Sequence, residues 1–405
     1  MIRKALTIIF TLALGVYLGY QLPRGAGLVS SLIGLGGQGP AEDYSTLASH
    51  QALIDFETTF SNAREMVLKD ARSAQEAIEG MRFLLRVAAM STHIIADANP
   101  ARPRFQRMDT WVRKAGGDNP DAEYFLAAID GTHDYRITGN LGSVRYVGFT
   151  INAGQGIEKR RQVGYLSDRT LTLDEAGNFT ILLSKTEPQE PGDWVQIPQD
   201  ASAVLVRQYI ADRDKEALPE MAIEVLGGNL PYRPPTDEEM AATITGTTYA
   251  FFALTHLHRT VLPELMEQPN AFIRATSDKL GGAISGQDNL YMLGSYQLAQ
   301  GEALKVTVQP PDSRYWNLVA ETRWHEIYDY LTRPTSRTLE DVEFAADGSV
   351  EFLVSHVDTG HPNWIDTSGH AFGFLTLRWL DARHEDVPMP EVELVQLAAD
   401  SDQGT

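Results

Sequence analysis

The chain has 405 residues, and its 43% hydrophobic and 22% charged residues are typical of a folded globular protein rather than of a disordered chain or a protein with many membrane spans. Its net charge of −20 disfavours nucleic acid as a partner, because the phosphate backbone would be repelled. The absence of cysteine excludes disulfides, thiolate metal sites and a cysteine nucleophile.

The N-terminus has the pattern of an export signal. Arg3 and Lys4 precede an apolar, uncharged run over residues 5–22, which is near the shortest length that spans a bilayer. No small-x-small cleavage site follows, so we expect an uncleaved signal anchor over residues 1–23 and then a glycine-rich tether over 24–43. The basic residues before the run place the body in the periplasm, held to the inner membrane by one span. Cleavage and release into the periplasm is the alternative.

Helices and strands are expected in blocks along the body, over residues 44–115 (helical), 116–234 (β), 235–290 (helical insertion), 291–382 (β) and 383–405 (acidic tail). Apolar residues at helical spacing, such as Phe56, Phe60 and Val67, predict the first helical block. Thr236 and Glu239 have the spacing of a capping box at the start of the second. The β blocks consist of short β-branched and aromatic runs bounded by turn residues.

The predicted fold class is mainly β with helical segments, an α+β chain. Many short strands in succession favour a jelly roll or β-sandwich body, to which the helices are added. The strands of the two β blocks could close one sandwich together or form two, and the pattern does not choose between these arrangements.

Three stretches carry a family resemblance: Glu79–Arg86 (EGMRFLLR), Lys114–Tyr124 (KAGGDNPDAEY), and a C-terminal block with Tyr315–Asn317, Pro362–His370 and Arg378–Trp379. In combination they resemble the bacterial family named domain of unknown function 1214, over about residues 45–382. The resemblance implies a jelly-roll body with helical insertions and a setting near catabolic genes. It implies no activity, so it assigns no catalytic residue and no cofactor.

A polar cluster over residues 356–370 is the strongest candidate for chemistry. Its candidate catalytic residues are His356, Asp358, His361 and His370, because histidine and aspartate supply general bases near neutral pH. His356, Asp358 and His361 could also supply the ligands of a divalent metal. The alternative is a structural loop in which aspartate and asparagine make turn hydrogen bonds.

Aromatic residues are frequent in the second β block and suggest a surface for sugar rings or aromatic molecules. The candidate ligand-binding residues are Trp316, Trp324, Asn363, Trp364 and Arg378. Packing in the core is the alternative for the tryptophans.

Known catalytic motifs are incomplete in this chain. His325-Glu326-Ile327-Tyr328-Asp329 is half of the zinc-protease motif H-E-x-x-H, but Asp329 stands where the second histidine is needed. Neither a nucleophile elbow nor a phosphate-binding loop of the Walker type is present.

Two functions remain open. The first is a membrane-anchored envelope protein that binds a small apolar or carbohydrate-like molecule, or a protein partner. The second is an enzyme, a hydrolase or lyase that acts on a catabolic intermediate through the loop over 356–370 and could depend on a metal.

Overall fold

The computed structural model describes residues 42–154, 160–228, 231–260, 263–275, 288–383 and 386–397. The expected anchor over 1–23 and nearly all of the tether lie outside these residues. Among the helices of the described part, none has the length and apolar character needed to cross a bilayer.

The first helical block is shorter than expected. It consists of η1 (Tyr44–Thr46), α3 (Ala48–Asp70), α4 (Ala74–Ser91) and the π-helical turn η2 (Thr92–Ala96). Ser73 caps α4 by accepting a hydrogen bond from the amide of Glu76. The helical pattern stops before Pro100 and Pro103, which cannot donate the backbone hydrogen bonds of a helix, and the chain then enters a loop.

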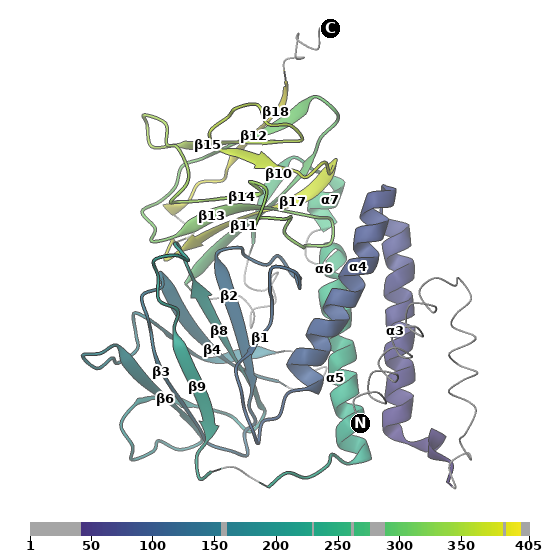
Figure 1. Cartoon of the computed structure of the whole chain (residues 1–405), viewed down its shortest axis with the longest axis vertical. Coiled ribbons are helices and arrows are strands. Elements are labelled where there is room, and N and C mark those ends of the chain that lie inside the picture. The colour runs from purple at the N-terminus through teal and green to yellow at the C-terminus, as the bar shows by residue number, and fades with distance from the viewer. Residues whose placement is uncertain are drawn as a thin grey trace, which may run out of the picture.

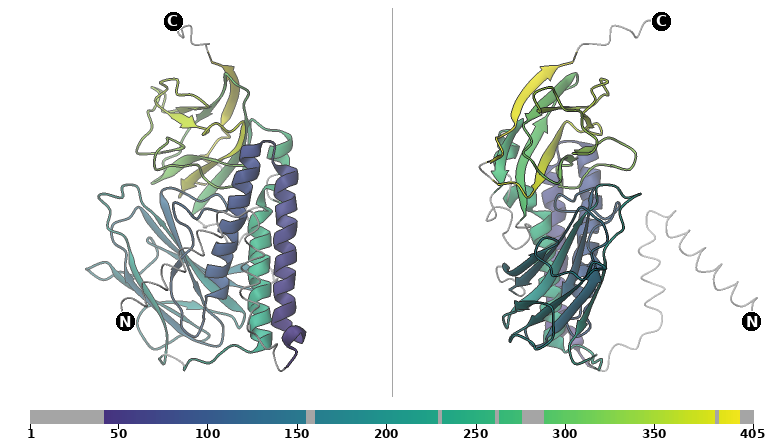
Figure 2. Two further views of the ribbon diagram at one scale, coloured as in Figure 1. Left: turned by 45° about the vertical axis from the view of Figure 1, so that its right-hand side comes forward. Right: turned by 90° about the vertical axis from the view of Figure 1, so that its left-hand side faces the viewer.

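The inserted helix is broken into pieces. Helix α5 (Asp237–Thr255) begins with the predicted capping box of Thr236 and Glu239 and is followed by α6 (Leu257–Thr260) and α7 (Pro263–Glu267). Pro263 cannot extend the preceding helix and instead begins α7. Helices α3, α4 and α5 lie side by side along the molecule (Figure 2) around a shared core that includes Phe251.

The strands of the first β block form one sandwich together with the short strand β1, which lies in the segment expected to be helical. A five-stranded sheet in the order β1-β2-β8-β4-β5 packs on a four-stranded sheet in the order β7-β6-β3-β9. The bounds are β1 (Gln106–Arg107), β2 (Ala122–Ala128), β3 (Tyr135–Asn140), β4 (Tyr146–Ala153), β5 (Arg161–Ser167), β6 (Asn178–Ser184), β7 (Asp193–Gln196), β8 (Ala201–Tyr209) and β9 (Glu220–Val225).

The remaining strands form a second sandwich. Its five-stranded sheet has the order β10-β11-β17-β13-β14 and its four-stranded sheet the order β16-β15-β12-β18. The bounds are β10 (Ala271–Ala275), β11 (Asn289–Gln297), β12 (Glu302–Val308), β13 (Trp316–Glu321), β14 (Ser336–Thr338), β15 (Val350–Ser355), β16 (Trp364–Asp366), β17 (Phe372–Leu380) and β18 (Glu391–Gln396). The chain is therefore α+β and mainly β, with two sandwiches rather than one.

The two sandwiches repeat one topology. Each strand of the first corresponds to the strand with a number nine higher in the second, in both sheets and in the same order. The parallel pair β6–β7 recurs as the parallel pair β15–β16, while the other pairs are antiparallel. Sandwich architecture is thus doubled within one chain, which the sequence pattern did not reveal.

The repeats meet at an approximate two-fold axis. Arg145 donates to the carbonyl oxygen of Arg314 at 3.1 Å, and Arg314 donates back to the carbonyl oxygen of Arg145 at 3.2 Å. Tyr146, Tyr209 and Tyr315 pack together behind them, with ring centroids 4.9–5.2 Å apart. Figure 1 shows the second sandwich above the first, with the helices running alongside both.

Candidate functional site

A cavity of about 230 Å³ lies between the two five-stranded sheets and the helices. Its walls are the outer faces of β2, β8, β11, β13 and β17, together with α4, α5, α6 and the loop before β2. Most of the lining surface is apolar, from side chains such as Met90, Leu205, Leu254 and Leu293. Gly116 in that loop lines the cavity and is exposed to solvent.

Each repeat places one tyrosine and one arginine in the cavity wall. Tyr124 on β2 stands directly opposite Arg207 on β8, and Tyr291 on β11 stands directly opposite Arg378 on β17. In the shared topology β2 corresponds to β11 and β8 to β17, so these two pairs occupy equivalent positions. Burial raises the pKa of the Tyr124 phenol above its ordinary value, so it remains a neutral hydrogen-bond donor.

Arg207 is a buried cation with little to balance it. It is 3% exposed, and within the described residues its guanidinium makes a single hydrogen bond, to Thr150 Oγ1 at 3.0 Å. No carboxylate oxygen of the described residues lies within 4 Å of its guanidinium nitrogens. Burying a charge without a counter-charge is costly, so an anion that enters the cavity is stabilised at this position.

Arg378 has a different environment. Its Nη2 donates to the carbonyl oxygens of Gly117 and Asp118 and lies 3.9 Å from Glu321 Oε1, whereas its buried Nη1 has no partner in the described part of the chain. Glu321 on β13 stands opposite Phe374 on β17. In the first repeat the equivalent residue is Asn152 on β4, which stands opposite Ala203 on β8. Among the described residues, therefore, only the second repeat has a carboxylate beside its arginine.

Glu321 holds a histidine by one ring nitrogen. Its Oε2 lies 3.1 Å from His325 Nδ1, and its Oε1 accepts a hydrogen bond from Thr376 Oγ1 at 2.6 Å. Burial raises the pKa of Glu321, but the hydrogen bond and charge of His325, aided by Arg378, outweigh burial and leave the pKa lowered. Beside the Glu321 carboxylate the ring of His325 has a proton on Nδ1, so when the ring gives up its other proton the lone pair is on Nε2.

The His325 ring is fixed in place by the loop that follows β13. The residue has a φ of +55°, a left-handed conformation that non-glycine residues seldom adopt. Its ring stacks on Phe374 with centroids 4.2 Å apart, and its carbonyl oxygen accepts from the amide of Gly117 at 2.9 Å. The Nε2 atom is buried without a hydrogen-bond partner among the described residues.

Two further carboxyl groups line the cavity, and both are shifted toward the neutral form. Burial raises the pKa of Asp109 to about 6. Burial also raises the pKa of Asp118 well above its ordinary value, although the charge of Lys114 opposes the shift. Burial thus favours the neutral form of Asp118, and Asp109 becomes neutral as the pH falls through about 6.

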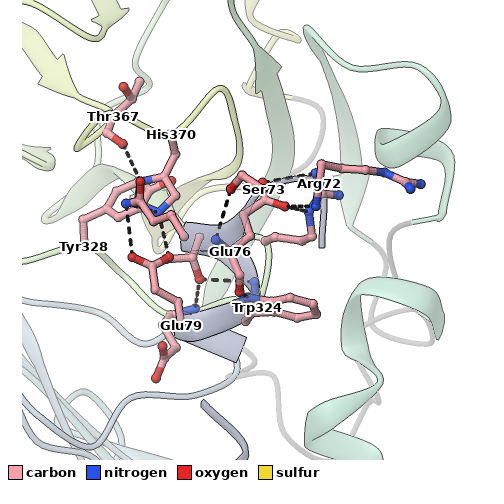
Figure 3. A network of polar contacts seen from close by, with 12 residues as sticks. Arg72, Ser73, Glu76, Glu79, Trp324, Tyr328, Thr367 and His370 are labelled. Atoms are coloured by element: carbon pink, nitrogen blue, oxygen red, sulfur yellow. Dashed lines mark hydrogen bonds and ion pairs between the residues drawn. The ribbon is translucent and has the colours of Figure 1, made fainter. Parts of the chain in front are cut away.

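A buried polar network connects the loop after β13, which contains His325, to helix α4, as Figure 3 shows. The carboxylate of Glu76 accepts from Arg323 Nε at 2.8 Å. It also accepts from the amide of Arg72 at 2.7 Å (Figure 3). The indole of Trp324 donates to the carbonyl oxygen of Glu76 at 2.9 Å. Because Arg323 and Trp324 directly precede His325, α4 sets the position of the histidine.

His370, a predicted catalytic residue, belongs to the edge of the same network. Its Nε2 lies 2.7 Å from Glu79 Oε2 on α4, and its Nδ1 lies 3.0 Å from the carbonyl oxygen of Thr367 (Figure 3). Burial lowers the pKa of His370, but the hydrogen bond and charge of Glu79 outweigh this and leave it raised. The contacts suit an imidazolium that joins α4 to the second sandwich.

The other residues of the predicted catalytic cluster lie apart from the cavity. His356 Nδ1 contacts Thr367 Oγ1 at 2.7 Å, Asp358 accepts from the amide of Gly360, and His361 Nε2 lies 3.5 Å from Glu351. No hydrogen bond or ion pair joins any two of the four predicted catalytic residues within the described ranges. The segment over 356–370 is also not a simple loop, since it contains β16 paired with β15.

The predicted metal ligands His356, Asp358 and His361 are not gathered into a site. Among the described residues, no three histidine, aspartate or glutamate side chains come close enough to hold a metal ion. The physical reason is local: Asp358 turns back onto the backbone of its own loop, and His361 Nδ1 accepts from the amide of Asn363.

Of the five predicted ligand-binding residues, Arg378 alone lines the cavity. Trp316 is 1% exposed in the core of the second sandwich. Trp324 is 1% exposed and packs in the core that the helices share. Asn363 is buried and its amide bridges the carbonyl oxygens of Glu343 and Glu351, while Trp364 donates to Ser355 Oγ.

Sequence reasoning missed the polar residues of the cavity, which are Asp109, Asp118, Tyr124, Arg207, Tyr291, Glu321, His325 and Thr376. His325 was considered only as part of a zinc-protease motif, but it lies in a turn after a strand. A signal was present in the repeats: Tyr-x-Leu at Tyr124 and Tyr291, and Arg-Tyr at Arg145 and Arg314. A comparison of the chain with itself would have aligned both.

A solved structure shows the same fold over most of the chain. A crystal structure of a putative uncharacterized protein from Burkholderia cenocepacia is similar with a TM-score of 0.80 and 28% sequence identity, over 86% of this chain and 98% of that one. A protein from Vibrio parahaemolyticus matches with a TM-score of 0.47 and 13% identity, over 77% of this chain and 99% of that one. No curated protein matches the sequence.

A family model described as protein of unknown function, DUF1214, matches residues 126–213 and 272–384. The first segment runs from β2 to beyond β8 and the second from β10 to beyond β17, so each segment covers most of the strands of one sandwich. The expected family resemblance is thereby confirmed, and the chain belongs to the family of proteins of unknown function named DUF1214.

Proposed function

We propose that the protein binds a small, largely apolar organic acid in the cavity between its two sandwiches. The observation that carries this proposal is Arg207, a buried guanidinium in a mostly apolar cavity wall with no carboxylate of the described residues within salt-bridge distance. A carboxylate of the ligand would supply the missing charge and accept hydrogen bonds from the guanidinium. Tyr124, directly opposite on β2, adds a phenol donor.

The size of the cavity limits the ligand. A cavity of roughly 150 Å³ accommodates benzene, so about 230 Å³ suits an acid with one aromatic ring or a short acyl chain. Apolar groups around the cavity, such as Met90, Leu254 and Leu293, match the body of such a molecule. This narrows the expectation of an apolar or carbohydrate-like ligand to an apolar acid.

The test compares acids with neutral analogues. Hexanoate, benzoate and 3-phenylpropanoate are titrated by calorimetry and by thermal shift, each beside its primary amide. We expect the acid to bind at least tenfold more tightly than the amide, since a hydrogen bond to a charged group contributes about 1.5–3 kcal/mol. Native mass spectrometry of protein from cells would give the mass of a retained acid.

Variants separate this interaction from general effects. Arg207→Met should remove the preference for acid over amide, while Arg136→Met, at an exposed arginine on β3, should keep it. Equal binding of acid and amide to the unaltered protein would contradict the proposal. So would the absence of binding across the whole panel together with a bare polypeptide mass.

We further propose that residues 5–22 anchor the protein in the inner membrane with its body in the periplasm, which the basic and apolar pattern of the N-terminus supports. Cell fractionation with protease accessibility tests this. Recovery of the full-length chain in the cytoplasmic fraction would contradict it.

A further inference from the structure

The two halves of the cavity have diverged from a common arrangement. Both retain the tyrosine–arginine pair, but only the second repeat has a carboxylate beside the arginine and a histidine on that carboxylate. At the position equivalent to Glu321 the first repeat has Asn152, which cannot act as a charged partner. The first half thus offers a cation for an anion, while the second offers a paired carboxylate and imidazole.

We propose that the protein is an enzyme that moves a proton on the bound acid, with His325 as the general base and Glu321 as its positioning residue. This inference rests on the proposed function, because binding of the acid group at Arg207 places the rest of the ligand beside His325 in the second half of the cavity. A base must have a free lone pair, a fixed ring and a partner that stabilises its protonated form. His325 meets each requirement.

The free lone pair follows from the hydrogen bonds. Nδ1 faces the ionised Glu321 at 3.1 Å and Nε2 has no partner among the described residues, so the neutral ring has its acceptor at Nε2. The ring is fixed by stacking on Phe374, and Thr376 fixes the carboxylate from the other side. A buried ring nitrogen without a hydrogen-bond partner and a φ of +55° both lower the stability of the fold. A histidine with a purely structural role would not need either feature.

The step is balanced without a co-reactant. The lone pair of His325 Nε2 takes a proton from a carbon next to a carbonyl group of the ligand, the C–H bond breaks, and its electron pair passes to the carbonyl oxygen to give an enolate. Arg378, in the same wall, supplies positive charge for that oxygen. The imidazolium then returns the proton to the same or the conjugated carbon. The class of reaction is therefore proton exchange or isomerisation of a keto or unsaturated acid.

The experiment measures exchange of carbon-bound hydrogen with solvent. The full-length protein is incubated in D₂O with 4-oxopentanoate or 2-oxo-4-phenylbutanoate, and proton NMR follows the signals next to the ketone. We expect exchange faster than in buffer, and a loss of at least 100-fold in His325→Asn, since general-base catalysis contributes roughly 10²–10⁴-fold. Asparagine tolerates a positive φ, which favours folding of the variant. His361→Asn is the matched control and should exchange at the unaltered rate.

Glu321→Gln distinguishes positioning from general support. Removing the carboxylate charge should lower the apparent pKa of the base in the pH–rate profile as well as the rate, whereas a structural effect would lower the rate alone. The groups around His325 are Glu321 on β13, Arg378 on β17, Asp118 before β2 and His258 on α6. Burial lowers the pKa of His258 to about 4, so it remains neutral over the range of interest.

The outcomes separate the two proposals. If the keto acids bind with an affinity that depends on Arg207 but exchange no faster than in buffer, binding stands and the enzymatic inference is overturned. Exchange that persists in a folded His325→Asn protein also overturns it. If none of the acids binds, the proposed function fails and the inference fails with it. Calorimetric titration of each variant, with its thermal unfolding, shows which case applies.

Discussion

Breaking the ion pair between Glu76 and Arg323 should destabilise the protein by about 3–5 kcal/mol, because it leaves a buried charge without a partner. Both side chains are at most 7% exposed. The Glu76 carboxylate accepts two hydrogen bonds from Arg323, at 2.8 and 3.3 Å, and one from the amide of Arg72. Glu76→Met removes all three hydrogen bonds and keeps the approximate volume of the side chain. The cost therefore reports the charge and its hydrogen bonds rather than a cavity.

The double variant Glu76→Met, Arg323→Met should recover much of this loss. Replacing both partners removes the burial cost of two charges along with their attraction, so it can be nearly neutral. Arg323 also lies 4.3 Å from the centroid of the Phe372 ring, a contact that methionine can retain. We therefore expect a large loss of unfolding free energy in the single variant and a small loss in the double variant.

Urea unfolding followed by circular dichroism and by tryptophan fluorescence measures these free energies, provided that the two transitions coincide. Glu224→Met, at an exposed ion pair with Arg136, is the control and should cost less than about 1 kcal/mol. A loss below about 1 kcal/mol for Glu76→Met would refute the reasoning. So would a double variant whose loss equals the sum of the single losses, since the pair would then not be coupled.

Three further predictions concern pH and packing. The pKa of His370 is raised and that of Glu79 is lowered, so their ion pair stabilises the protein from the ordinary pKa of a carboxylate up to the raised pKa of the imidazole. His370→Gln should therefore lower the melting temperature more at pH 5.5 than at pH 9. An equal effect at both pH values would contradict a stabilising ion pair. Affinity for an acid should rise as the pH falls through about 6, because Asp109 loses its charge, and Asp109→Asn should remove that part of the calorimetric pH dependence. Gly80→Ala should cost about 1–3 kcal/mol in urea unfolding, since its Cβ would lie 2.3 Å from a valine methyl, whereas Gly246→Ala in α5, with 3.5 Å to its nearest neighbour, should be neutral or stabilising.

The sequence predicted local structure well where local chemistry determines it. The capping box at Thr236 is present because Glu239 and Thr236 need only three residues of helix to meet. Short alternating strands indicated sandwiches correctly, because burial on one face fixes a two-residue period. Strand β17 is buried on both faces, so its burial does not alternate, and the outward face that lines the cavity could not be told from the core face.

The site could not be read in the same way, because its residues meet only after the two sandwiches pack. Arg207 and Arg378 lie on strands far apart in the chain, and neither has a motif that marks it. The cluster over 356–370 attracted attention because it is dense in polar residues. Density alone does not distinguish side chains that bind a ligand from side chains that satisfy a backbone, and Asp358 does the latter.

A duplicated sandwich offers a physical route from a structural interface to a binding site. Two equivalent sheet faces that meet near a two-fold axis bring two copies of the same arginine into one cavity, where their repulsion is unfavourable unless one is neutralised. In this chain the second copy is balanced by Glu321, and the first is left for a ligand. Asn152→Glu would place a carboxylate at the equivalent position beside Arg207. If the asymmetry is what selects an acid, this single change should abolish acid binding while leaving the His325 half intact.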